Sequence, residues 1–386
     1  MIHFDHNATT PVAASALETF LEATRKSWHN PSGPCRNSAR VRNLLEAARA
    51  RAADLLGCAP ERVVFNSGAT EGVNAIIAHG ARLAAQSDLP LLHSPVEHPC
   101  VTEAAAWHAP GRVMIAETDA NGTVRLDSLE NALAEKRPVM VSIMAANNET
   151  GAFQPWREIA SLCRRAGVPY HCDAAQWIGK LPAAGLAASD FLTVSAHKFG
   201  GPKGVGLLVL PEEPGAFRSL VGGAQENGRR AGTENYPAAA ALVTALEAAE
   251  RMAAEGVESR LRWRQRFENE LEKRLPGLRV AAAEADRLWN TTRLILPRGD
   301  QTRWLRKLDR RGFCVSTGSA CATGSEKLSP VLAALGFAED EIRRGLRISS
   351  GWETTETDWQ TLFAALLEVE EEIDGDSEGP GEVITV

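Results

Sequence analysis

The sequence predicts an α/β fold, in which a mostly parallel central sheet forms a large domain and a smaller α+β domain follows. Three observations lead to this prediction. Apolar runs rich in β-branched residues alternate with amphipathic stretches over roughly 150 residues. Clusters of polar residues follow these runs, where the strands of such a sheet end. The chain has 386 residues, which is long enough for two domains.

The composition is that of a globular protein in water. Hydrophobic residues make up 44% of the chain and charged residues 24%, and the net charge is −7. The negative charge argues against nucleic acid as a direct partner. The first residues lack the basic and apolar segments of a signal peptide, and no apolar run approaches the roughly 18 residues of a membrane span. We therefore expect a cytoplasmic protein without a membrane segment.

The seven cysteines are odd in number and irregularly spaced. This pattern argues against a disulfide framework and favours a reducing compartment. There is no C-x-x-C pair and no zinc-finger spacing. The sequence therefore predicts no structural metal site.

The expected elements follow one another in regular alternation. A first helix carries Leu17, Phe20 and Leu21 on one face, and a second ends at Gly57. Strands of the large domain are expected at 63–65, 91–93, 113–115, 139–144, 168–172, 191–194 and 205–210. Helices are expected to follow the first five of these strands. One long charged helix, from 237 to about 275, is expected to lead to the second domain.

The predicted domain division follows from this order of elements. Residues 15–250 would form the large α/β domain. Residues 1–14 and 251–370 would form the small α+β domain, with strands at 292–296, 313–316 and 346–348. The last twenty residues, which are rich in Asp and Glu, would form a frayed helix end and a disordered acidic tail, with the tail at 371–386.

The stretch from Ser195 to Gly204 carries the clearest chemical signal. Buried apolar runs precede and follow it, and its glycines and proline predict a tight turn. Ser195, His197 and Lys198 therefore leave the end of one strand together. A lysine of lowered pKa can form a Schiff base with a carbonyl cofactor. The alternative is a solvated lysine in a polar loop, which is the more common situation for a lysine considered alone.

Three other features supply partners for Lys198. Asp173 follows a buried strand, where it could pair with a protonated ring nitrogen or cap a helix. His98 lies in another strand-end loop, where it could stack on a flat ring or face solvent. The turn Gly68–Thr70 precedes a helix, whose free amide groups favour a phosphate. A lysine, a carboxylate and a phosphate cradle are what pyridoxal 5'-phosphate (PLP) requires.

At this point the chain resembles the cysteine desulfurases, the NifS/IscS-like group of the class V aminotransferase-like, PLP-dependent fold-type I family. The resemblance runs from Asp5 to about Thr355. The matching segments are residues 5–11, 67–71, 97–98, 147–151, 171–176, 195–204, 230–233, 318–321 and 347–349.

The resemblance implies how PLP would be held. Lys198 would hold it as a Schiff base, Asp173 would pair with its ring nitrogen, and Gln176 would bond its ring hydroxyl oxygen. His98 would stack on the ring and move protons. The phosphate would be held by Ala69, Thr70, Ser195 and His197, together with Thr233 from the second subunit of a homodimer.

The resemblance also implies the substrate and the sulfur acceptor. Asn148, which borders the cofactor, and Arg347 would bind the carboxylate of L-cysteine. Cys321 would accept the sulfur as a persulfide and pass it to an acceptor protein, and it could serve as a transient iron–sulfur ligand. Cys321 lies in a loop of small residues, which suits a thiol that moves, although a buried structural cysteine is more common.

Three positions depart from the family pattern. Asn66 stands where the family usually has Thr, and Ala175 stands where it has Thr between Asp and Gln. Gly351-Trp352 stands where a further Arg is common. This change affects the expected surface and the mouth of the substrate site, and it does not affect the expected chemistry. Two alternatives therefore stay open: a selenocysteine or other C–S lyase, which does not need Cys321, and a non-catalytic sulfur-transfer scaffold.

Overall fold

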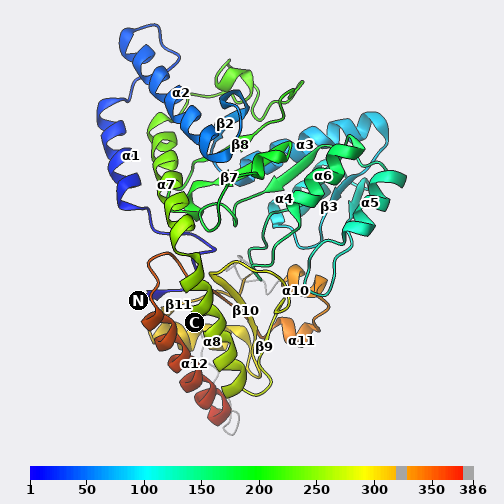
Figure 1. The fold of residues 1–386 in the computed structure, drawn as a ribbon, viewed down its shortest axis with the longest axis vertical. Helices are drawn as coiled ribbons and strands as arrows, with labels where there is room; N and C mark the ends of the chain where they lie inside the picture. Colours follow the sequence, from blue (N-terminus) through cyan, green and yellow to red (C-terminus); the bar gives the residue numbers. More distant parts are fainter. Residues whose placement is uncertain (319–327, 377–386) are drawn as a thin grey trace, which may run out of the picture.

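The computed structural model describes residues 1–318 and 328–376 (Figure 1). Within these residues, seven strands form the central sheet in the order β2-β8-β7-β6-β5-β3-β4. The strands are β2 (Val63–Asn66), β3 (Leu91–His93), β4 (Val113–Ile115), β5 (Met140–Ser142), β6 (Tyr170–Asp173), β7 (Phe191–Ser195) and β8 (Gly206–Val209). β3 to β7 are parallel, whereas β8 runs antiparallel to both β2 and β7. The prediction of a mostly parallel sheet is confirmed.

Helices cover both faces of this sheet, so its middle strands are buried on both sides. One face packs against α3 (Ala69–Ser87) and α4 (Pro99–His108). The other packs against α2 (Arg36–Leu56), α5 (Leu126–Glu135), α6 (Trp156–Ala166) and α7 (Tyr236–Glu255). α1 (Ala14–Lys26) lies against α7 (Figure 1). Short 3-10 turns lie at Pro60–Arg62, Leu186–Ala188, Ala196–Lys198 and Glu226–Gly228.

A second hydrophobic core lies below the large sheet in Figure 1. Its sheet has the order β12-β10-β9, and a separate parallel pair joins β1 to β11. The strands are β1 (Ile2–His3), β9 (Arg279–Val280), β10 (Thr291–Ile295), β11 (Phe313–Cys314) and β12 (Gly345–Ser349). The helices are α8 (Val257–Arg274), α9 (Gln301–Arg310), α10 (Pro330–Ala334), α11 (Glu339–Ile342) and α12 (Glu356–Asp376). The N-terminus therefore packs with the last third of the chain. The domain boundaries themselves stay a prediction.

One helix differs from the sequence-based expectations. The long helix expected from 237 to 275 is two helices that meet at Gly256, where a Cβ would lie 2.9 Å from an Arg260 nitrogen. The expected helix with Leu17, Phe20 and Leu21 is α1. Its Ala16 is fully buried and Phe20 packs against the core of the large sheet, whereas Leu17 and Leu21 are 46% and 42% exposed.

The acidic C-terminal stretch also differs from the expectation. Residues 371–376, expected in a disordered tail, are the last turns of α12. Glu372 pairs with Lys307 at 2.9 Å and also with Arg311. Glu370 pairs with Arg298 at 2.9 Å. These basic partners on neighbouring elements hold the acidic helix end, which charge counting along the sequence could not show. Residues 377–386 lie outside the described part of the chain.

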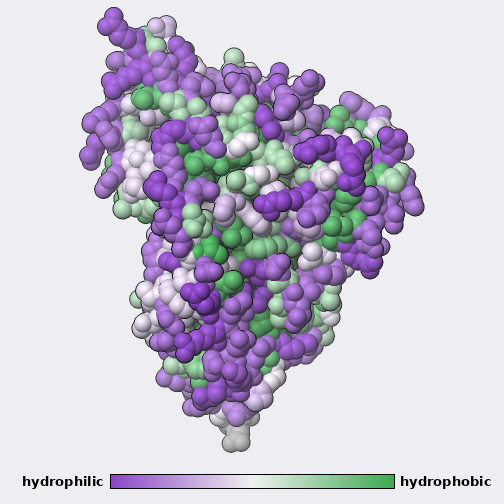
Figure 2. Space-filling view, viewed as in Figure 1, coloured by the Kyte–Doolittle hydropathy of each residue, from purple (hydrophilic) through white to green (hydrophobic). Residues whose placement is uncertain are grey.

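Figure 2 shows a face that is largely hydrophilic, with hydrophobic side chains gathered near the middle, where the upper and lower bodies meet. Within residues 1–318 and 328–376, no helix combines the length and hydropathy needed to cross a bilayer.

Candidate active site

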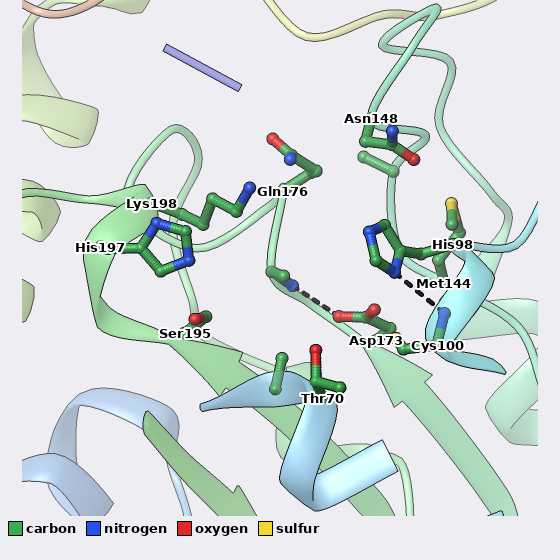
Figure 3. A pocket seen from close by; sticks show the side chains of 13 residues that line it. Thr70, His98, Cys100, Met144, Asn148, Asp173, Gln176, Ser195, His197 and Lys198 are labelled. Carbon is green, nitrogen blue, oxygen red and sulfur yellow. Dashed lines mark hydrogen bonds between the residues drawn. The ribbon is translucent and has the colours of Figure 1, made fainter. Parts of the chain in front are cut away.

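A cavity of about 230 Å³ lies where the carboxyl ends of β6 and β7 face the first turns of α3 and α4 (Figure 3). It is lined by Ala69, Thr70, His98, Cys100, Met144, Ala146, Asn148, Asp173, Ala175, Gln176, Ser195, His197 and Lys198. Nine of these residues were predicted site residues. Segments from Ala69 to Lys198 therefore meet at one edge of the sheet, as parallel strands require.

Lys198 ends the short turn that follows β7. Its Nζ donates hydrogen bonds to the carbonyl oxygens of Asn7 (2.6 Å) and Ala8 (2.9 Å). Burial, followed by the positive charge of Arg347, lowers the pKa of Lys198 to about 8. The solvated-loop alternative is wrong for this lysine. Its amine can lose a proton near neutral pH, as a Schiff-base lysine must.

Asp173 is the last residue of β6 and is 6% exposed. Its Oδ1 accepts a hydrogen bond from the Ala175 amide at 2.9 Å, drawn as a dashed line in Figure 3. Burial raises the pKa of this carboxyl group, while that amide, His98 and Lys198 act in the opposite direction. A cation inside the cavity would therefore favour its ionised form.

His98 caps the N-terminus of α4. Its Nδ1 accepts a hydrogen bond from the Cys100 amide at 3.1 Å. In the neutral ring the proton therefore lies on Nε2. Burial lowers the pKa of His98 and keeps the ring neutral near pH 7. Figure 3 shows this ring facing the open space between Asp173 and Asn148.

The start of α3 forms an anion cradle beside Ser195. Gly68 precedes the helix with φ 146°, and no described side chain caps it. A Cβ on Gly68 would make only ordinary contact with Ser195 Oγ, at 3.5 Å, so the positive φ is what favours glycine here. Asn66 Oδ1 accepts the Gly68 amide at 3.0 Å and fixes the turn. The first-turn amides and the hydroxyls of Thr70 and Ser195 then suit a phosphate, because a helix N-terminus favours negative charge (Figure 3).

Three predicted site residues do not line the cavity. Arg347 is 2% exposed and donates to Asp5 Oδ1 at 2.7 Å and to the Asn148 carbonyl at 3.1 Å. It thus lies behind Asn148. Thr233 is exposed and was assigned to a neighbouring subunit. Cys321 lies outside the described residues. Among those residues, no cluster of His, Cys, Asp or Glu could hold a metal ion.

Comparison with known proteins places this chain in a family. The model of the family described as aminotransferase class-V matches residues 2–362. The chain belongs to this family. A cysteine desulfurase of Nostoc sp. is 33% identical over 97% of this chain and 94% of its own length. The cysteine desulfurase IscS of Methanosarcina thermophila is 33% identical over 95% of this chain and 91% of its own length.

Solved structures with the same fold support this assignment. A NifS-like protein superposes with a TM-score of 0.88 at 29% identity, covering 96% of this chain and 99% of that one. The structure of SspA in complex with cysteine superposes with a TM-score of 0.78 at 29% identity, covering 90% of this chain and 98% of that one. These neighbours confirm the predicted PLP fold type I, because nearly every element of this chain has a counterpart in them.

The departures from the aminotransferase class-V pattern have structural explanations. The side-chain oxygen of Asn66 accepts the hydrogen bond that closes the turn at Gly68. Ala175 contributes its backbone amide, which needs no hydroxyl side chain. Gly351 lies against His6, where a Cβ would come within 2.2 Å of the ring. Trp352 donates from Nε1 to the Gly179 carbonyl at 2.7 Å. Trp352, which follows β12 of the small sheet, therefore links that part of the chain to the loop after β6 of the large sheet.

The sequence reasoning missed three residues around the cavity. The backbone carbonyl of Asn7 accepts a hydrogen bond from Lys198 Nζ. The segment 5–11 was recognised as a motif, but this role of Asn7 was not. Cys100 lines the cavity, and burial strongly raises the pKa of its thiol, so it is an unreactive neighbour. Lys180 is buried beside Gln176, only seven residues beyond Asp173. A second lysine so close to the motif was the available signal.

Proposed function

We propose that this protein is a PLP-dependent cysteine desulfurase, which converts L-cysteine to L-alanine and leaves the sulfur as a persulfide on Cys321. One observation carries the proposal: the amine of Lys198, the carboxylate of Asp173 and the anion cradle after Gly68 face one cavity. These groups suit the aldehyde, the ring nitrogen and the phosphate of PLP. The names of the relatives in the family support the choice of reaction.

The residues around the cavity divide the work of holding PLP. Asp173 would pair with the ring nitrogen, Gln176 would bond the ring hydroxyl oxygen, and His98 would stack on the ring. The phosphate would be held by Ala69, Thr70, Ser195 and His197, together with Thr233 from the second subunit of a homodimer. PLP bound in this way supplies an electron sink for the α-carbon of an amino acid.

The chain's own groups bind the substrate and move its protons. Asn148, which lines the cavity, would bind the carboxylate of L-cysteine, and Arg347 would join it after releasing Asp5 and the Asn148 carbonyl. Nζ of Lys198 takes the α-proton, since its lowered pKa leaves part of the amine unprotonated near pH 8. Asp173 is buried, which strengthens the charge interactions of its carboxylate with groups in the cavity.

Cys321 completes the reaction by accepting sulfur. Its thiolate attacks the substrate sulfur, and the new S–S bond forms as the C–S bond breaks. Overall, one enzyme thiol and one cysteine give one persulfide and one alanine, so atoms and electrons balance. The persulfide then passes to a sulfur-acceptor protein.

Two variants test the proposal. Purified protein with PLP should show an absorbance band at about 420 nm, and Lys198→Ala should lose both the band and alanine release. Under turnover with cysteine, mass spectrometry should find a persulfide on Cys321. Cys321→Ala should keep the band and stop alanine formation. Unaltered alanine release by Cys321→Ala would instead identify a C–S lyase, and failure to load PLP would identify a non-catalytic protein.

A further inference from the structure

Lys180 is a buried lysine outside the mechanism described so far. Its side chain is 4% exposed, and its Nζ donates to Gln176 Oε1 at 2.9 Å. The charged groups that face it are basic. Burial, followed by the positive charges of Lys198 and Arg347, lowers the pKa of Lys180 to about 7, and His6 and His197 also lie close enough to interact with its charge. Buried charges usually have a carboxylate partner, and within the described residues Lys180 has an amide.

This contact decides how the Gln176 amide is oriented. The protonated amine of a lysine can only donate hydrogen bonds, and here it donates to the Gln176 oxygen, which therefore faces Lys180. The nitrogen Nε2 then points the other way and donates to the Asn7 carbonyl at 3.0 Å. A reversed amide would place its NH₂ group against the Lys180 amine. Gln176 also lines the cavity, so its remaining N–H is the group available to a ligand.

The same contact reaches Lys198 through one shared atom. The Asn7 carbonyl accepts from Gln176 Nε2 and also from Lys198 Nζ at 2.6 Å. Figure 3 shows the Lys198 side chain extending toward Gln176. A chain of hydrogen bonds therefore runs from Lys180 to Gln176, to Asn7 and to Lys198. Such connected bonds respond together when one member is removed.

Two tryptophans fix the backbone at Lys180. Trp289 donates from Nε1 to the Lys180 carbonyl at 2.8 Å, and Trp352 donates to the preceding carbonyl, that of Gly179, at 2.7 Å. Their rings lie 4.4 Å apart. Because both tryptophans come from the second body of the fold, they hold Lys180 against the large sheet. These two hydrogen bonds therefore fix the position of the Lys180 backbone.

We propose that Lys180 is a positioning residue, which holds Gln176 so that an N–H donor faces the ring oxygen of the bound cofactor and which, in its protonated form, places a positive charge behind Lys198. The inference rests on the proposed function, because the ring oxygen is that of PLP. Lys180 touches neither substrate nor cofactor and acts through Gln176. Its contribution should therefore appear in the spectrum of the bound cofactor as well as in turnover.

The test compares Lys180→Met with Lys180→Arg and with Lys203→Met, which removes an exposed lysine from the turn near Lys198. Each PLP-loaded protein is titrated with base and acid while the band at about 420 nm is followed. Lys180→Met should move the titration midpoint upward by about one pH unit, since losing a cation and a donor favours proton uptake nearby. It should also weaken PLP binding about tenfold. Lys180→Arg keeps a charged donor and should stay near the wild type, as should Lys203→Met.

The outcomes separate the two proposals. A Lys180→Met midpoint equal to that of the wild type would overturn the positioning role, and so would an equal shift in Lys203→Met. Lys180→Gln removes the charge in a polar side chain, and an unmoved midpoint there overturns the proposal if Lys180→Met does not fold. Wild-type protein that loads PLP but releases no alanine would remove the desulfurase proposal and leave this comparison intact. Wild-type protein that cannot load PLP would overturn both.

Discussion

Arg293 and Glu149 form a buried ion pair, with Arg293 Nη2 3.5 Å from Glu149 Oε2. Arg293 Nη1 donates to the Thr317 carbonyl at 2.5 Å, and Glu149 Oε2 accepts from Ser329 Oγ at 2.7 Å. Thr317 and Ser329 flank the segment that contains Cys321. One ion pair beneath the site thus holds both ends of the segment on which the proposed sulfur acceptor lies.

The first prediction concerns this pair. Arg293→Met should lower the free energy of unfolding by about 3–5 kcal/mol, because it leaves the Glu149 carboxylate buried without its cation. The double variant Arg293→Met with Glu149→Gln should lose less than the sum of the single variants, since neither charge is left unpaired. Urea denaturation followed by tryptophan fluorescence measures both quantities. Additive losses would show that the two residues do not interact.

A second prediction concerns Gly318, which lies directly above Arg293. A Cβ there would come within 2.4 Å of Arg293 Nη1, and φ is 87°. Gly336 has nearly the same φ, 83°, with no atom within 4 Å of its Cβ position. Gly336→Ala should cost about 1–2 kcal/mol for the backbone alone. Gly318→Ala should cost a further 1–3 kcal/mol, roughly, for displacing Arg293. Equal losses in the two variants would mean that Arg293 moves aside freely.

The sheet and most of the cavity were predictable because their signals are local. Asp173, Ser195 and Lys198 each lie directly at or after an apolar run, and the ends of parallel strands meet at one edge. The turn at Gly68 was likewise visible in the residues that form it. Site residues that lie at the end of a strand, or in the loop that follows it, can therefore be predicted from one sequence.

Contacts between the two bodies could not be predicted in the same way. The Lys180 carbonyl bonds a tryptophan 109 residues further along the chain. Trp352 appeared to bear on the substrate mouth, yet it bonds Gly179. The basic partners of the α12 glutamates come from α9 and the preceding loop. Hydrophobic period and motif spacing carry no information on such distant pairs.

A third prediction tests why Gly351 departs from the family pattern. Any side chain there would meet the His6 ring, which is 5% exposed and packs edge-on to His3. Gly351→Ala should therefore lower the free energy of unfolding by about 1–3 kcal/mol. Gly375→Ala, in the open part of α12, should be neutral or raise it by about 0.5–1 kcal/mol. Thermal unfolding of both variants measures the contrast, which an unchanged Gly351→Ala protein would contradict.

The fourth prediction is a pH dependence of stability set by Glu97, which lies beside His98. Burial raises the pKa of Glu97 to about 8. Between pH 4.5 and 8 the folded protein then keeps a proton that the unfolded chain has released. Stability from this group is therefore present at low pH and is lost as the pH rises through that window, by an amount on the order of 5 kcal/mol.

Glu97→Gln isolates this effect. Ser94 Oγ and the Met144 amide both donate to Oε1 of Glu97, an atom that glutamine retains. The variant should be nearly as stable as the wild type at about pH 5 and more stable at about pH 8. Urea unfolding at several pH values measures the difference. Glu103→Gln, which removes an exposed carboxylate of α4, serves as the control and should follow the wild type. A wild-type minus Glu97→Gln difference that stays flat with pH would show that Glu97 is ionised in the folded protein.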